Sequence, residues 1–144
     1  MIRELKIEEI NKIMRIWKES TIKAHKFIPE SYWLKNYSLV KETYIPMANT
    51  FVYIEKEKIK GFISIINDEF IGAIFVDINY QGQGVGTSLI DFVKNKYNKL
   101  NLAVYKENEE SVGFYKKMGF IIQRQQVNKD TDKAEFIMSW SILT

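Results

Sequence analysis

The 144-residue sequence contains no cysteine and only one histidine, His25. Without cysteine the chain can form no disulfide, and it has no thiol nucleophile and no thiolate metal ligand. A single histidine also excludes a zinc site built from several histidines. We therefore expect a protein that uses neither cysteine chemistry nor a metal cofactor.

The sequence also lacks a long apolar run and a strong excess of charge. No segment approaches the roughly 20 apolar residues that a membrane-spanning helix needs. The first ten residues, MIRELKIEEI, alternate charged and apolar side chains and do not form a signal peptide. We therefore expect a cytoplasmic protein with no membrane partner. The net charge of +3 suits an anionic small molecule but is too low to indicate nucleic-acid binding.

The length predicts a single domain over residues 1–144. Apolar residues make up 46% of the chain and charged residues 27%, which is ordinary for a globular protein that buries its own core. There is no internal repeat and no linker-like segment. The sequence leaves the oligomeric state open between a monomer and a homodimer.

Hydrophobic periodicity predicts a mixed order of helices and strands. Strands are expected near residues 1–5, 51–54, 59–66, 70–76, 100–104, 120–127 and 135–141. Helices are expected from about residue 8 to residues 19–21, from 29 to about 45, from 85 to about 97 and from 109 to 118. Residues 21–28 are interpreted as a connection that carries His25. The central strands are apolar on both faces, so helices should cover the sheet on both sides.

The most informative stretch joins the strand at residues 70–76 to the next helix. It places Gly82, Gly84 and Gly86 at alternate positions just before the helical periodicity begins. A helix start offers unpaired N–H groups and a partial positive charge, which favour an anion, and glycines let the backbone approach it. The spacing is not that of a dinucleotide fingerprint, because Thr87 replaces its third glycine, and no P-loop lysine follows.

The spacing Gln81-x-x-Gly84-x-Gly86 resembles the signature of the GNAT superfamily of N-acetyltransferases, in which this loop binds the pyrophosphate of acetyl-CoA. A second segment, NEESVGFYKKMGF at residues 108–120, is similar to the second cofactor segment of that family. Here Ser111 stands at the family's usual small residue. The predicted order of elements matches the family along the whole chain.

The resemblance extends to a subgroup, the YiaC-like bacterial acetyltransferases. Residues 25–28, His-Lys-Phe-Ile, and residues 137–140, Ile-Met-Ser-Trp, look like that group. The resemblance implies an α/β (α+β) GNAT fold, with a mixed central sheet of about seven strands flanked by about four helices. It also implies a splayed pair of strands at the cofactor site.

The resemblance further implies where acetyl-CoA, the co-substrate, binds. Its pantetheine arm would pair with the free edge of a strand, as an added strand does. The implied cofactor-binding residues are Ile74, Phe75, Val76, Gln81, Gly82, Gln83, Gly84, Val85, Gly86, Thr87, Asn108 and Tyr115. Asn108 can also cap the helix that it precedes.

Acyl transfer from a thioester to an amine needs an oxyanion donor, an acid for the thiolate and a base for the amine. The resemblance assigns the first role to the backbone N–H of Val76 and the second to Tyr115, for which core packing is the alternative. The glutamate that many relatives carry on the strand is absent from residues 70–76. His25 is the preferred base, with a structural role as its alternative. Asp68, Glu69 and Asp77 are the other candidate bases, for which a solvated turn charge is the alternative.

The sequence leaves two classes of function open. The preferred one is an enzyme that acetylates a primary amine by direct attack in a ternary complex, with His25 and Phe70 lining the acceptor site. The other is a non-catalytic module that binds acyl-CoA as a sensor or regulator. The acceptor can be a small molecule or a protein, and the YiaC-like features favour protein lysine over other amines.

Overall fold

A seven-stranded sheet forms the centre of the computed structural model, which describes residues 1–143. Its spatial order is β1-β2-β3-β4-β5-β7-β6, with β4 and β5 parallel and all other neighbours antiparallel. The strands are β1 Ile2–Glu4, β2 Asn49–Glu55, β3 Lys58–Ile66, β4 Phe70–Val76, β5 Lys99–Tyr105, β6 Ile121–Val127 and β7 Ala134–Ser141. This is the mixed sheet that the sequence predicts.

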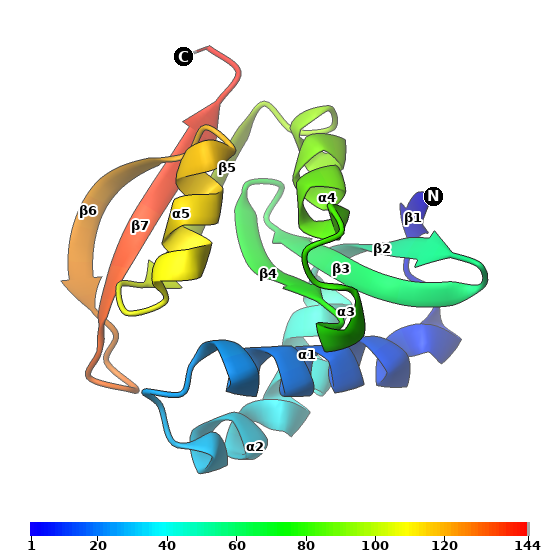
Figure 1. The fold of residues 1–144 in the computed structure, drawn as a ribbon, viewed down its shortest axis with the longest axis horizontal. Coiled ribbons are helices and arrows are strands. Elements are labelled where there is room, and N and C mark those ends of the chain that lie inside the picture. The colour runs from blue at the N-terminus through cyan, green and yellow to red at the C-terminus, as the bar shows by residue number, and fades with distance from the viewer. Residues whose placement is uncertain (144) are drawn as a thin grey trace.

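Helices cover both faces of the sheet (Figure 1). The α-helices are α1 Ile10–Ala24, α2 Glu30–Leu39, α3 Ile45–Met47, α4 Val85–Lys94 and α5 Glu109–Lys117, with short 3-10 turns at Ile7–Glu9 and Ile78–Tyr80. On one face, Met14 and Trp17 of α1 pack on Val52 and Phe62. On the other face α4 and α5 form a second core. The prediction that helices cover both faces of the sheet is therefore confirmed.

The first helix is longer than the sequence predicts. It was expected to end at residues 19–21, but α1 continues to Ala24, so only the last part of the predicted connection is irregular. Ser20 and Thr21 are buried, and the Ser20 hydroxyl donates to the carbonyl of Val76 at 2.8 Å. This tertiary contact overrides the weak helix propensity of serine and threonine.

The second predicted helix is interrupted at its C-terminal end. After α2, residues Val40–Tyr44 form a π-turn, in which the N–H of Ile45 donates to the carbonyl of Val40. Pro46 has no N–H and its ring would clash with the carbonyl four residues back. A wider turn relieves that conflict, and the helical run then ends at Met47.

The parallel strands β4 and β5 diverge soon after they meet. Their only registered pair is Phe70 with Asn101, whereas β5 and β7 pair along their whole length. The register shift between β3 and β4 leaves Gly72 without a partner, and such a bulge bends the strand that carries it. The predicted splayed pair is confirmed, and the bulge accounts for it.

The splay leaves one backbone edge of β4 without a strand partner. The N–H of Asp77 donates to the Lys60 carbonyl on β3 at 2.8 Å. Backbone groups alternate in direction along a strand, so those of Val76, one residue earlier, point away from β3 and toward the gap. The Val76 carbonyl accordingly accepts from side chains, those of Ser20 and Gln81.

Candidate active site

A cavity of about 810 Å³ lies where β4 and β5 separate. Its wall includes Leu102 and Val104, which belong to the core beneath α4 and α5. It also includes Ala103 and Tyr105, which alternate with them and therefore lie on the opposite face of β5. The cavity is thus lined by residues from both faces of the sheet.

The glycine loop forms one end of this cavity. Gly82 and Gly84 have φ of 78° and 84°, a left-handed conformation that disfavours other residues. No heavy atom lies within 4 Å of the Cβ that either position lacks. Gly84 is the N-cap residue of α4, so the open backbone precedes a helix start that favours an anion.

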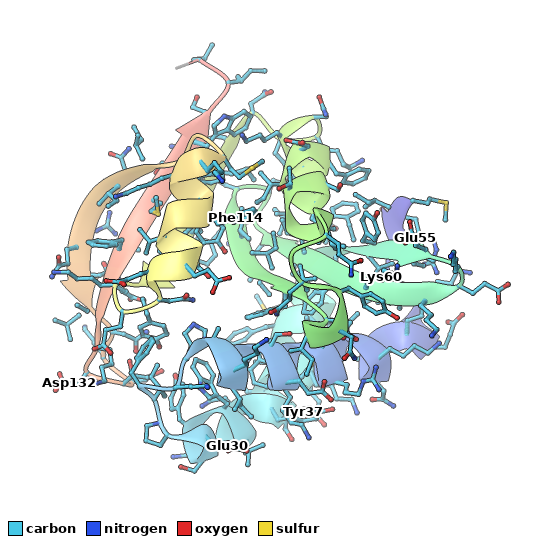
Figure 2. The ribbon with its side chains drawn as sticks, in the orientation of Figure 1. Glu30, Tyr37, Glu55, Lys60, Phe114 and Asp132 are labelled. Atoms are coloured by element: carbon cyan, nitrogen blue, oxygen red, sulfur yellow. The ribbon has the colours of Figure 1, made fainter. Side chains whose placement is uncertain are left out.

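Gly86, in the first turn of α4, faces Phe114 of α5. A Cβ at Gly86 would lie 3.4 Å from Cζ of Phe114, which is on the side of α5 that faces α4 (Figure 2). A Cβ at this third glycine would therefore make an ordinary van der Waals contact, whereas Gly82 and Gly84 serve the loop conformation.

Lys23, near the end of α1, places a positive charge beside the loop. Its Nζ donates to Oε1 of Gln81 at 3.3 Å, and Nε2 of Gln81 donates to the Val76 carbonyl at 3.2 Å. The ammonium group of Lys23 therefore lies where it would attract an anion bound by the glycine loop. The sequence gives no signal for this contact, because Lys23 and Gln81 are far apart in the chain.

Tyr115 is buried on α5 and also lines the cavity. Its ring lies between those of Phe114 and Phe120, with centroids 5.4 and 5.9 Å away. Burial raises the pKa of the Tyr115 phenol well above its usual value, so it stays protonated at neutral pH. Core packing and a place in the cavity wall are both observed for this residue.

His25 follows the end of α1, is buried and also lines the cavity. Its Nδ1 is 2.8 Å from the Thr21 carbonyl, which can only accept, so the proton is on Nδ1. Nε2 is then an acceptor, and Nδ2 of Asn108 donates to it at 3.4 Å. Burial lowers the pKa of His25 below 6.5, so the ring is neutral at neutral pH.

Asn108 joins this side of the cavity to α5. It is the N-cap residue of α5, where its Oδ1 accepts from the N–H of Ser111 at 3.3 Å. The predicted cap is confirmed. The same side chain contacts His25, so the second cofactor segment and the sole histidine meet in the structure.

Comparisons with known proteins decide the family. The sequence profile of the Acetyltransferase (GNAT) domain matches residues 25–133. The peptidyl-lysine N-acetyltransferase YiaC of Escherichia coli K12 is 34% identical over 143 residues, which are 99% of this chain and 98% of YiaC. The chain belongs to the GNAT acetyltransferase family. As a member, it is an acetyl-CoA-dependent N-acetyltransferase. Of the two functions that the sequence left open, the comparisons therefore favour the enzyme over the non-catalytic acyl-CoA-binding module.

Solved structures show the same fold. Apo YjaB from Escherichia coli superimposes with a TM-score of 0.85 at 26% identity, covering 97% of this chain and 96% of YjaB. The PaiA N-acetyltransferase from Thermoplasma acidophilum, solved with coenzyme A, gives a TM-score of 0.77 at 23% identity, covering 98% of each chain.

Most predicted site residues of this acetyltransferase line the one cavity. These are His25, Phe70, Ile74, Phe75, Val76, Gln81, Gly82, Gly84, Val85, Gly86, Thr87, Asn108 and Tyr115. Gln83 does not line it. Asp68, Glu69 and Asp77, the alternative bases, also lie outside its wall. Asp77 pairs with Arg15 at 3.7 Å, and Glu69 pairs with Lys99 at 3.4 Å.

The sequence reasoning missed several residues of the wall. Trp33 of α2, Tyr105 of β5 and Glu135 of β7 gather around the His25 side. The one local signal was the acidic residue at the start of the predicted strand at 135–141. Within residues 1–143, no group of three potential metal ligands occurs, and no helix is both long and apolar enough to cross a membrane.

Proposed function

We propose that this acetyltransferase transfers the acetyl group of acetyl-CoA to the ε-amine of lysine side chains in polypeptides. The observation that carries the proposal is a cavity lined by residues from both faces of the sheet. A thioester can enter from the α5 side while a long, flexible amine enters from the other side. The similarity to YiaC, named as a peptidyl-lysine N-acetyltransferase, supports this acceptor class.

In this proposal the cofactor follows β4 to the glycine loop. The pantetheine arm pairs with the open edge at residues 74–76, and the pyrophosphate lies against the amides of residues 81–87. The left-handed glycines and the open space above them support this placement. Lys23 adds a cation on the same rim. The coenzyme A complex of PaiA shows that a protein of this fold binds the cofactor.

The reaction is a direct attack with both substrates bound. The amine nitrogen forms a bond to the thioester carbon while the carbon–sulfur bond breaks, and the thiolate leaves. The N–H of Val76, directed into the gap, donates to the carbonyl oxygen as negative charge develops on it. The thiol that forms has an ordinary pKa near 8.5, far below that of the buried Tyr115 phenol. Tyr115 therefore stabilises the thiolate chiefly as a hydrogen-bond donor.

His25 is the group we propose for the proton of the amine. Its ring is neutral, and the Thr21 carbonyl holds it in the tautomer that leaves Nε2 able to accept. Nε2 accepts from Nδ2 of Asn108 at 3.4 Å, a long contact that a bound amine would replace. An imidazole suits this role because it exchanges a proton near neutral pH.

A peptide panel tests the acceptor. We would compare an N-terminally blocked peptide with one lysine, the same peptide with norleucine at that position, and an unblocked peptide without lysine. Thiol release should depend on the lysine, and mass spectrometry should place the acetyl group on it. Turnover with the unblocked peptide, together with no turnover on the lysine peptide, would overturn the proposed acceptor.

A further inference from the structure

A buried carboxylate lies at the acceptor side of the cavity. Glu135, in β7, is only 7% exposed and lines the cavity wall. Its Oε1 accepts from Nε2 of Gln126 at 2.9 Å, and its Oε2 is 3.5 Å from Nδ2 of Asn128. These amide contacts hold the carboxylate in place but bring no positive charge.

The charge of Glu135 has no cationic partner among the described residues. None of the ion pairs found in residues 1–143 includes it, although the chain as a whole carries a net charge of +3. A buried charge without an opposite charge is costly. Binding of a cation in the cavity would supply the missing partner.

The surroundings of Glu135 suit an ammonium group on an alkyl chain. Tyr105 is its direct cross-strand neighbour, so the two side chains lie on the same face. The Tyr105 ring contacts those of His25 and Trp33, with centroids 5.3 and 6.5 Å away. Aromatic rings attract cations and accommodate methylene groups.

A second acidic residue, Asp130 in the β6–β7 connection, influences Tyr105. In Figure 1 the β6–β7 connection lies beside the loop that follows α1. The Tyr32 hydroxyl there donates to Asp130 at 3.4 Å. Burial is the main cause of the raised pKa of Tyr105, and the negative charges of Glu135 and Asp130 raise it further. Of these two acids, only Glu135 lines the cavity.

We propose that Glu135 is the residue that selects a cationic primary amine as the acceptor. Its carboxylate binds the ammonium group, Tyr105 and Trp33 line the path of the alkyl chain, and Gln126 and Asn128 hold the carboxylate in position. The inference rests on the proposed function, because the ε-amine of lysine is an ammonium group at neutral pH.

The test compares charged and uncharged acceptors in wild type and Glu135→Gln. One acceptor is the blocked lysine peptide, and the other is the same peptide with an aminooxy group, uncharged at pH 7.5, in place of the lysine amine. The preference for lysine, as a ratio of kcat/KM values, should fall roughly 10- to 100-fold in Glu135→Gln, as expected for loss of a buried charge partner. The KM for acetyl-CoA should not change.

Glu110→Gln is the matched control, because Glu110 also lines the cavity but is an exposed residue in the first turn of α5. Its preference should equal that of wild type. Glu135→Asp, which keeps the charge, should retain part of the preference, and it provides the test if Glu135→Gln does not fold. An unchanged preference in a folded Glu135 variant would overturn the inference.

The outcomes separate this inference from the proposed acceptor. If wild type acetylates lysine peptides and the Glu135 variants keep the wild-type preference, only the role of Glu135 fails. If wild type rejects lysine peptides, the same comparison is made with butylamine and its aminooxy analogue. If Glu135→Gln loses the preference for butylamine, the role of Glu135 is supported although the polypeptide acceptor has failed. If the preference is unchanged, both the role of Glu135 and the polypeptide acceptor are overturned.

Discussion

The side-chain amide of Asn108 lies 3.4 Å from Nε2 of His25, joining the first turn of α5 to the end of α1 across 83 residues of sequence. The same asparagine caps α5 through its other side-chain atom. One residue thus connects the second cofactor segment with the imidazole that faces the acceptor side.

Asn108→Asp should shift the acid limb of the kcat/KM profile to higher pH. Aspartate keeps the helix cap, but it replaces the amide donor with a negative charge, which favours the protonated imidazole. Asn108→Ser is the control, since serine also caps and adds no charge. The measurement is kcat/KM between pH 5 and 8. An acid limb at the wild-type pH in Asn108→Asp would show that the contact does not influence His25.

His25→Ala should lower kcat/KM by ~10²-fold or more, the low end for general base catalysis. The affinity for acetyl-CoA, measured by isothermal titration, should barely change because the His25 ring hydrogen-bonds Thr21 and Asn108 and not the glycine loop. Since the pKa of His25 is lowered, the wild-type acid limb should lie below pH 6.5 and should be absent from the variant. Wild-type turnover in His25→Ala would leave the residue a structural role only.

Tyr115→Phe should lower kcat by ~10²-fold, which corresponds to about 2.7 kcal/mol of transition-state stabilisation. Phenylalanine keeps the ring between Phe114 and Phe120, so the cost in folding should be limited to about 0.5–1.5 kcal/mol for one hydrogen bond. Tyr97→Phe, in the same core but outside the cavity wall, is the control. If kcat of folded, saturated Tyr115→Phe stays within about twofold of wild type, Tyr115 is only a core aromatic.

Gly86→Glu should abolish measurable binding of acetyl-CoA. The new side chain brings a negative charge to the first turn of α4, where we place the pyrophosphate, and like charges repel. Gly113→Glu makes the same exchange in α5, outside the cavity wall and with open space around it, and should bind normally. Isothermal titration and far-ultraviolet circular dichroism measure the two effects. Normal affinity in folded Gly86→Glu contradicts the loop assignment.

The stability of the protein should fall as the pH drops below about 6.5. Burial lowers the pKa of His25 in the folded state, so below 6.5 the unfolded chain binds the proton more readily. The loss should grow until the pH reaches the folded-state pKa. Glu9 does not contribute in this range, because the Arg3 hydrogen bond lowers its pKa from 4.5 to about 2, and its contribution is lost only at still lower pH.

Urea unfolding at pH 7.5 and pH 5.5 measures this dependence. His25→Gln cannot titrate, so its midpoint should change less between the two pH values than that of wild type. Equal changes in both proteins would assign the acid sensitivity to other groups.

The strands and the glycine loop are largely predictable because neighbouring residues encode them. Each strand lies within two residues of its expected range, since apolar periodicity and turn residues mark its limits. The same local patterns place Gly84 at the start of α4 and Asn108 at the cap of α5. The predicted end of α1 was wrong because the burial of Ser20 and Thr21 depends on contacts with β4, which the local sequence does not encode.

By itself the sequence determined the family, the order of elements and the loop that we assign to the cofactor, because short-range spacing carries all three. Only the tertiary structure decided how the acceptor side is built. Lys23 reaches Gln81, Asn108 reaches His25, and Glu135 lies opposite Tyr105. These contacts join residues that are far apart in the chain, and a strand register cannot be read from one strand alone. The bulge at Gly72 opens the gap that they surround.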